Sequence, residues 1–211
     1  MTETETGTPE RVRWQWVTEI LGVFLLSVVA VLTAWCGFQA SKWGGEMAIA
    51  FSQASSARIQ AADAEGAARS ARGFDLTIYG AYVEAVGDGN EQLADYIRER
   101  FTPEFAVAYE AWVEDGEVEN GPFARAEYVP EGSVEAEELN ARADEKFAEA
   151  LENNQRGDNY SLLTVLFALV LFLTAMSQRQ LAPWVARTLL GLAVVVAVVG
   201  VVLLTTFPIR I

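Results

Sequence analysis

Histidine is absent from this sequence of 211 residues, and cysteine occurs once, as Cys36. Without an imidazole, a serine or cysteine triad of the common type is excluded, and so is a histidine general base. A zinc site with the usual cysteine and histidine ligands is excluded too, and a single thiol cannot form an intrachain disulfide. We therefore expect Cys36 to be a small apolar packing residue, and we expect no metal site.

Basic residues are also scarce, with 15 Lys and Arg against 29 Asp and Glu and a formal net charge of −14. A nucleic-acid-binding surface needs clustered positive charge, so we expect no nucleic-acid partner. The sequence further lacks a phosphate-binding loop of the Walker type and a Gly-x-Gly-x-x-Gly turn after a strand. We expect no cofactor and no catalytic residues, and we predict that the protein is not an enzyme.

Apolar residues are abundant, at 52% of the chain, which conflicts with so large a net charge in one soluble domain. They concentrate near 17–38, 161–177 and 184–207. The block 39–159 between the first two runs holds 25 of the 29 acids and 10 of the 15 bases, a formal charge of −15. Membrane segments flanking one acidic aqueous domain explain both properties.

Three segments are long enough to span a bilayer, whose hydrocarbon core of about 30 Å needs roughly 20 apolar helical residues. We predict transmembrane helices at 14–38, 160–177 and 184–207. The fold class is then all-α, with a helical bundle at 39–159 inserted between the first two spans. A buried core hairpin is the other interpretation of the last two runs, but a domain this small could not cover three such helices. Aromatic residues lie at the segment ends, as expected at the membrane interface (Trp14, Trp16, Trp35, Trp43, Tyr160, Trp184, Phe207).

The first span is predicted to be an uncleaved anchor, because it is longer than a signal-peptide core and bulky residues follow it. Basic residues predict its orientation. The tail 1–13, the loop 178–183 and the start of the third span carry four of them (Arg11, Arg13, Arg179, Arg187), and the opposite face carries three (Lys42, Arg156, Arg210). The positive-inside rule therefore places the amino terminus in the cytoplasm, with the domain 39–159 and the tail 208–211 outside the cytoplasmic membrane.

The middle domain reads as helices throughout. Small residues recur at spacings of three and four after Trp43, which predicts that the first span continues as one helix with a narrow packing face. Gly44-Gly45 predicts a kink or a tight crossing. "TPEF" predicts a helix start with Thr102 as cap and Pro103 in the first turn. A long last helix is expected from Pro130–Glu131, and "RGDN" at 156–159 is expected to break it before the second span.

Four phrases of this sequence, "AWCGFQASKWGGEMA", "YIRERFTPEFAVAYEAW", "GPFARAEY" and "NQRGDNYSLLTVLFALVLFL", resemble a group of small, uncharacterised bacterial integral membrane proteins. The resemblance covers residues 14 to about 177. It implies three spans with a helical domain between the first and second, and it supplies no activity.

The residues just past the first span are the first candidate site: Lys42, Trp43, Gly44, Gly45 and Glu46. They form either an interfacial collar or a gate at the mouth of a pore. In the collar, Trp43 lies at headgroup depth, Lys42 reaches lipid phosphates, and Glu46 pairs with Lys42 one turn away. We favour the collar, because few polar residues in the spans could line a conduction path.

A second candidate is an ion pair inside the membrane. Glu19 lies about one turn into the first span, on the side where Arg187 enters the third. Charges within spans are costly and are usually paired. We therefore predict a Glu19–Arg187 pair; the alternative is that Glu19 reaches the headgroups alone.

Acidic residues elsewhere offer weaker candidates. The loop 114–121 packs four acids and an Asn, but its spacing differs from that of a helix–loop–helix calcium site, so a solvated loop is the default. Asp75, Glu104 and Glu110 could provide a carboxylate pair for hydrolysis, although a domain with 25 acids contains such pairs by chance.

The sequence predicts a non-enzymatic integral membrane protein whose acidic outer domain is a scaffold, sensor or accessory module. Its expected partners are the lipid bilayer and either a second copy or another membrane protein. Tyr109 and Trp112 are candidate packing surfaces, although an intramolecular role is simpler. The alternative function is a homo-oligomeric channel or transporter subunit, in which the small residues of 191–200 pack around an axis.

Overall fold

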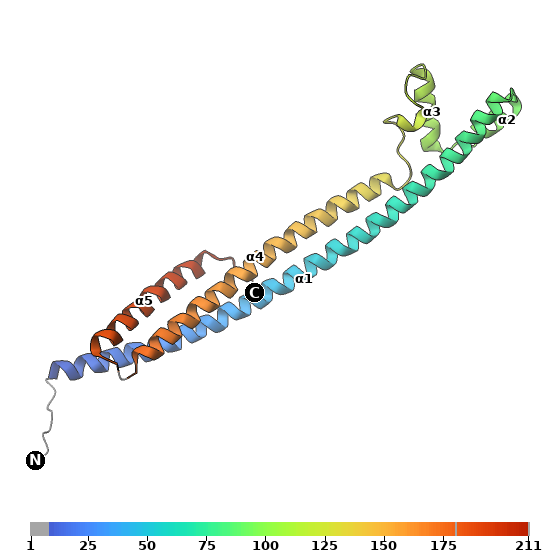
Figure 1. The fold of residues 1–211 in the computed structure, drawn as a ribbon. Coiled ribbons are helices and arrows are strands. Elements are labelled where there is room, and N and C mark those ends of the chain that lie inside the picture. Colours follow the sequence, from blue (N-terminus) through green and yellow to red (C-terminus); the bar gives the residue numbers. More distant parts are fainter. Residues whose placement is uncertain (1–8, 180, 211) are drawn as a thin grey trace, which may run out of the picture. The chain divides into compact units, whose positions relative to one another are not determined.

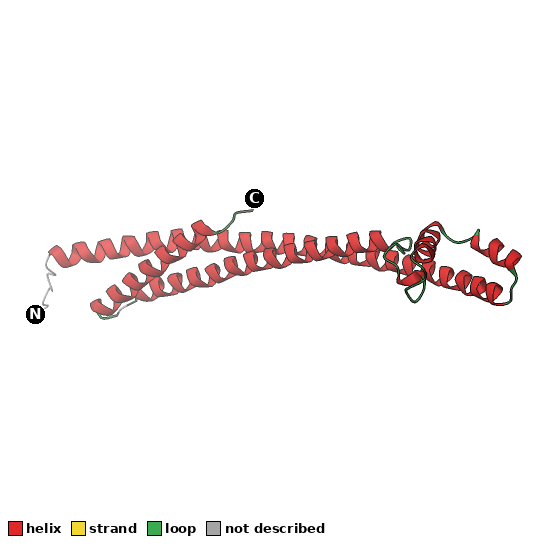
Figure 2. Ribbon diagram, turned by 90° about the horizontal axis from the view of Figure 1, so that it is seen from above, coloured by secondary structure: helices red, strands yellow, loops and turns green. Residues whose placement is uncertain are grey.

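The computed structural model describes residues 9–179 and 181–210, and for 9–15, 17 and 18 it describes the backbone alone. The described residues form helices and loops without a strand, so the all-α prediction is confirmed (Figure 2). Most of the tail 1–13, the side chains of Arg11, Arg13 and Trp14, and Ile211 lie outside this description. The elements along the chain are α1 (Pro9–Gly87), α2 (Glu91–Arg98), α3 (Pro103–Glu114), the 3-10 turn η1 (Pro122–Ala124), α4 (Ser133–Ser177) and α5 (Pro183–Thr206) (Figure 1).

Three helices, α1, α4 and α5, each contain a stretch long and apolar enough to cross a membrane. The protein is therefore a membrane protein by the length and composition of its helices, as predicted. Helix α1 has 79 residues, or about 120 Å at 1.5 Å per residue, roughly four times the hydrocarbon thickness. It continues without a break past the first span, which confirms the predicted continuity.

Two glycine-containing stretches of these helices are helical throughout. Helix α1 runs through Gly44-Gly45, and α4 runs through 156–159, so the predicted break at "RGDN" is wrong. Side-chain bonds one turn apart, Asn154 to Asp158 and Gln155 to Asn159, span this stretch of α4. A close crossing lies at the predicted place, and Gly157 of α4 allows it. A Cβ atom on Gly157 would lie 3.5 Å from the Ala40 carbonyl oxygen, 3.6 Å from Trp43 Cβ and 3.9 Å from the Gly44 amide nitrogen.

The chain divides into two compact units, which we describe separately. The membrane unit comprises the described residues up to 49 and from 149 onward. The acidic unit comprises 50–148 and carries 21 of the 29 acids and 8 of the 15 bases, a formal charge of −13.

The core of the membrane unit contains residues of all three spanning helices. Cys36 is fully buried in it, as expected of a packing residue. The small residues of α5 pack within the chain, because Ala193 and Ala197 belong to this core and Gly200 lies against Phe167 of α4. The buried members of the core are Val29, Cys36, Trp43, Tyr160, Leu163, Phe167, Val170, Leu173, Ala193 and Ala197.

In the acidic unit, α1 and α4 run antiparallel. Phe51 packs edge-on against Phe147 at 5.4 Å between ring centroids, and Arg58 Nη2 lies 2.6 Å from Asp144 Oδ1. Buried alanines line both helices, which confirms the predicted narrow packing face (Ala50, Ala54, Ala57, Ala61 and Ala64 of α1; Ala136 and Ala143 of α4). Each alanine removes little apolar area from water, so this pairing depends on close backbone approach rather than on large side chains.

The far end of α1 packs against α3 through aromatic rings. Tyr109 is only 9% exposed and contacts Trp112, so these two side chains pack inside the unit. The α3 start is as predicted, with Thr102 Oγ1 accepting a hydrogen bond from the Phe105 amide and Pro103 in the first turn. The cluster consists of Phe105, Ala108, Tyr109 and Tyr128, with Tyr79, Tyr82, Phe101, Trp112 and Phe123 around them.

Candidate functional site

The strongest polar constellation of the membrane unit lies where α1 continues past its predicted span. Gln39 is fully buried, and its side-chain amide makes two hydrogen bonds to the main chain of Arg210. Gln39 Nε2 donates to the Arg210 carbonyl oxygen, and the Arg210 amide donates to Gln39 Oε1, each at 2.9 Å. Tyr160 of α4 donates its hydroxyl to the Pro208 carbonyl oxygen at 3.0 Å. The chain after α5 is thus held by α1 and α4.

Within the predicted collar, the structure gives Glu46 a different partner and buries Trp43. Glu46 pairs with Arg210, with the Arg210 Nε and Nη2 atoms both 3.0 Å from Glu46 Oε1, and not with Lys42. Lys42 is exposed and forms no ion pair among the described side chains. A Cβ atom added to Gly44 or Gly45 would lie in open space, so the close approach of α4 does not require a glycine at either position.

Trp43 is 5% exposed and belongs to the core of the membrane unit, so its ring packs against protein rather than lipid. Its position at headgroup depth stays a prediction. The Arg156 guanidinium stacks over its ring at 4.7 Å from the centroid. Arg156 also bonds to Asn153 and Glu152 on its own helix. The Trp43 Nε1 atom is buried, and no described residue accepts a hydrogen bond from it, so this donor stays unused beside the Arg156 cation.

The structure does not bring Glu19 and Arg187 together. Both side chains are exposed, and no ion pair joins them within the part of the chain that the structure describes. Their pairing in a lipid bilayer stays a prediction.

In the acidic unit, Asp75 is the best-placed carboxylate of the three that the sequence singled out. It is 2% exposed, and its two oxygens accept hydrogen bonds from Thr102 Oγ1 at 2.7 Å and from the Tyr128 hydroxyl at 2.8 Å. Glu104 and Glu110 are exposed. Because Thr102 also caps α3, the Asp75 carboxylate ties α1 to the start of α3 and to the loop that carries Tyr128.

Burial raises the pKa of Tyr79, Tyr109 and Tyr128 above the ordinary tyrosine value, and for Tyr128 the hydrogen bond to Asp75 raises it further. The folded unit favours the neutral phenol of these tyrosines, and this preference stabilises the fold. The stabilisation is complete below the unfolded pKa of about 10 and is lost as pH rises through the higher pKa values of the folded unit.

We expect the acidic unit to unfold cooperatively above about pH 10, with tyrosinate absorbance rising in step. Circular dichroism and ultraviolet absorbance along one titration check this. Tyr96→Phe, at an exposed position, serves as the control and should leave the transition unchanged.

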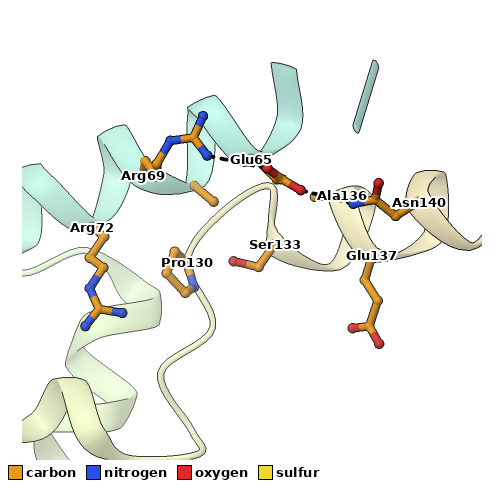
Figure 3. Close-up of a pocket in the computed structure, with 9 residues that line it drawn as sticks. Glu65, Arg69, Arg72, Pro130, Ser133, Ala136, Glu137 and Asn140 are labelled. Carbon is orange, nitrogen blue, oxygen red and sulfur yellow. Dashed lines mark hydrogen bonds and ion pairs between the residues drawn. The ribbon is translucent and has the colours of Figure 1, made fainter. Parts of the chain in front are cut away.

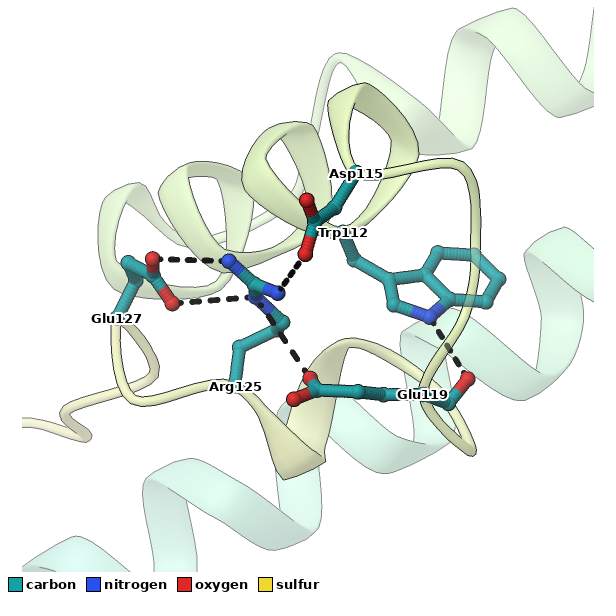
Figure 4. A network of polar contacts seen from close by, with 5 residues as sticks. All are labelled: Trp112, Asp115, Glu119, Arg125 and Glu127. Carbon is teal, nitrogen blue, oxygen red and sulfur yellow. Dashed lines mark hydrogen bonds and ion pairs between the residues drawn. The ribbon is translucent and has the colours of Figure 1, made fainter.

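The acidic loop after α3 is organised by one cation. Arg125 Nη1 lies 2.6 Å from Asp115, its Nη2 lies 3.0 Å from Glu127, and its Nε lies 3.7 Å from Glu119 (Figure 4). The pKa of Arg125 is raised by its hydrogen bonds to Glu127, the larger cause, and to Asp115. The pKa of Glu127 is lowered by a hydrogen bond from the backbone amide of Glu127 itself and by the one from Arg125. Trp112 Nε1 donates to the Glu119 carbonyl oxygen at 2.9 Å, which closes the loop. The loop acids bind an internal arginine, and no group of three metal ligands is found among the described residues.

A shallow groove of about 530 Å³ lies between α1 and the start of α4 (Figure 3). Glu65 receives hydrogen bonds there from Arg69, at 3.4 Å, and from Asn140, at 3.0 Å. Two arginines and two glutamates balance its charge, so the lining selects neither cations nor anions. The lining residues are Glu65, Ala68, Arg69, Arg72, Pro130, Ser133, Ala136, Glu137 and Asn140.

No known protein family, curated protein or solved structure matches this chain. Its functional interpretation therefore depends on the contacts above. The sequence indicated Glu46 and Asp75 but not their partners, and it gave no indication of Gln39 or Arg125 as organising residues. The only available signal for Arg125 was a lone basic residue next to an acidic loop.

Proposed function

We propose that the protein is a non-enzymatic integral membrane protein whose acidic helical domain acts as a scaffold, sensor or accessory module for another membrane component. One observation carries this proposal. Helices α1 and α4 each hold a candidate span, yet they have 79 and 45 residues and continue far beyond the roughly 20 that a bilayer requires. The additional residues build a second compact unit with its own aromatic core.

In this proposal the domain 39–159 is inserted between the first and second spans and lies outside the cytoplasmic membrane. The positive-inside rule supports that orientation, with the amino terminus in the cytoplasm. The charge of −13 on the acidic unit favours a partner with a basic surface, and such an association weakens as salt screens the charges. The Asp75, Arg125 and Glu46 side chains are engaged within the chain, which suits structural roles better than catalytic ones.

The alternative is a homo-oligomeric channel or transporter subunit. Its main support was the small-residue run 191–200, which could pack around a symmetry axis. Ala193, Ala197 and Gly200 of that run pack against the chain's own core, which leaves fewer small residues for contacts between copies.

The mass of the purified protein in lipid nanodiscs tests the proposal, measured by native mass spectrometry in several lipid compositions. The proposal predicts a monomer or a dimer. In so small an assembly, three mostly apolar spans per chain leave no room for a pore. A single closed ring of several subunits would overturn the accessory function. It would justify ion-flux assays on Lys42→Gln and Glu46→Gln, with Lys146→Gln in the acidic unit as the control.

A further inference from the structure

The segment 207–210, which we name the C-terminal strap, follows the end of α5 at Thr206 and is not helical. Its main chain is nevertheless hydrogen-bonded to the protein. Phe207 has φ −90° and ψ 141°, an extended conformation. Beside a membrane, non-helical backbone is tolerated where protein groups satisfy its polar atoms. Here those groups are side chains of α1 and α4, from residues more than 45 positions away in the sequence.

The strap's main chain is bound in the way that a neighbouring β-strand would bind it. The Gln39 amide supplies one donor and one acceptor to the same residue, Arg210, and Tyr160 supplies a donor to Pro208. Contacts of this kind recognise an extended backbone and are independent of side-chain identity. Because Gln39 is fully buried, its amide is fixed in place for this role.

Two further contacts recognise side chains. The Phe207 ring packs edge-on against Tyr160, with 5.5 Å between centroids. The Arg210 guanidinium places two nitrogens 3.0 Å from one Glu46 oxygen. The side chains of Glu46 and Arg210 are 30% and 51% exposed, so this pair is open to solvent and to competition.

We propose that Gln39, Glu46 and Tyr160 form a recognition site for an extended peptide with an aromatic residue followed three positions later by arginine. The chain's own strap occupies the site in cis and thereby blocks it. A partner segment of the same chemistry displaces the strap. Tethering gives the strap an effective concentration of about the millimolar range, so wild-type protein binds a competing peptide weakly. This inference concerns the membrane unit and does not depend on the function proposed for the acidic unit.

The first experiment tests the docked strap in the full-length protein. In nanodiscs with ¹⁵N-arginine labelling, the Arg210 amide should exchange with solvent deuterium at least tenfold faster in Gln39→Ala than in wild type. Lys42→Gln alters an exposed neighbour outside these contacts and should leave the rate unchanged. Equal rates in wild type and Gln39→Ala would show that the strap is not held by this site, and the proposal would fail.

The second experiment tests recognition in trans with a fluorescein-labelled peptide of sequence TTFPIR, corresponding to residues 205–210. Full-length Arg210→Glu, whose own strap is repelled by Glu46, should bind this peptide at least tenfold more tightly than wild type does. Glu46→Arg alone, whose strap is repelled by the new arginine, should instead bind the peptide TTFPIE. Combining Arg210→Glu with Glu46→Arg restores an opposite-charge pair, so this double variant should bind both peptides as weakly as wild type does. If no variant binds either peptide, or if the peptide affinity does not change with the residue at position 46, the strap has only a structural role and the proposal is overturned. Circular dichroism of each variant confirms that it is folded.

Discussion

Replacing Gly132 with alanine should destabilise the acidic unit by about 3 kcal/mol or more. Gly132 has φ +87°, a left-handed conformation that costs an L-residue about 1–2 kcal/mol. An added Cβ would also lie 2.7 Å from the Ala64 carbonyl oxygen, which belongs to the backbone of α1 and cannot move aside as a side chain can. The start of α4 would have to shift away from α1, so the cost includes lost packing.

Hydrogen exchange followed by mass spectrometry measures this effect on peptides from 101–130, where the aromatic cluster reports unfolding of the acidic unit. Gly80→Ala is the matched control, because Gly80 is helical and has open space around its Cβ position. Alanine there should be neutral or stabilising by up to about 1 kcal/mol. Equal protection in the two variants would contradict the proposed close approach at Gly132.

Replacing Asp75 with alanine should lower the free energy of unfolding by about 3–6 kcal/mol, because it removes two hydrogen bonds to a carboxylate and such bonds contribute about 1.5–3 kcal/mol each. Asp75 is nearly inaccessible and accepts two such bonds, from Thr102 and Tyr128. In the variant, the Tyr128 hydroxyl loses its acceptor in a buried site. The loop that carries Tyr128 also loses its connection to α1.

A double-mutant cycle with Tyr128→Phe separates this bond from the rest of the effect, with urea unfolding of each full-length variant followed by exchange of the same peptides. The double variant should cost less than the sum of the single ones, since it removes the Tyr128 hydroxyl that Asp75→Ala alone leaves without its acceptor. Glu104→Gln, at an exposed acid of the same unit, should change stability by less than about 0.5 kcal/mol. A loss below about 1 kcal/mol in Asp75→Ala would show that its two bonds contribute little.

Much of the fold follows from local sequence signals. Continuous apolar runs predicted the three spanning segments, and the Thr102-Pro103 start predicted the beginning of α3. The start of α4 was placed too early, at Pro130, because Gly132 has a positive φ that a right-handed helix does not allow, and the helix begins at Ser133. The helix break expected at 156–159 failed because Gly157 there serves packing against α1 rather than a turn.

The candidate sites were harder to predict, since each depends on residues distant in sequence. Spacing along one helix favoured Lys42 as the partner of Glu46, whereas the fold brings Arg210 there from 164 residues away. Trp43 was predicted to be a headgroup anchor because it follows a span. In the fold it is buried, and the guanidinium of Arg156 from α4 covers its ring. No pattern within a single segment contains this information.

The alanine-lined pairing of α1 with α4 in the acidic unit has a thermodynamic consequence. Alanine has no side-chain rotamers to freeze, so the pairing costs little side-chain entropy when it forms. It also removes little apolar surface from water, and the heat-capacity change on unfolding scales with that surface. This stretch should therefore contribute a small heat-capacity change, and its stability should vary less steeply with temperature than that of the aromatic cluster in the same unit.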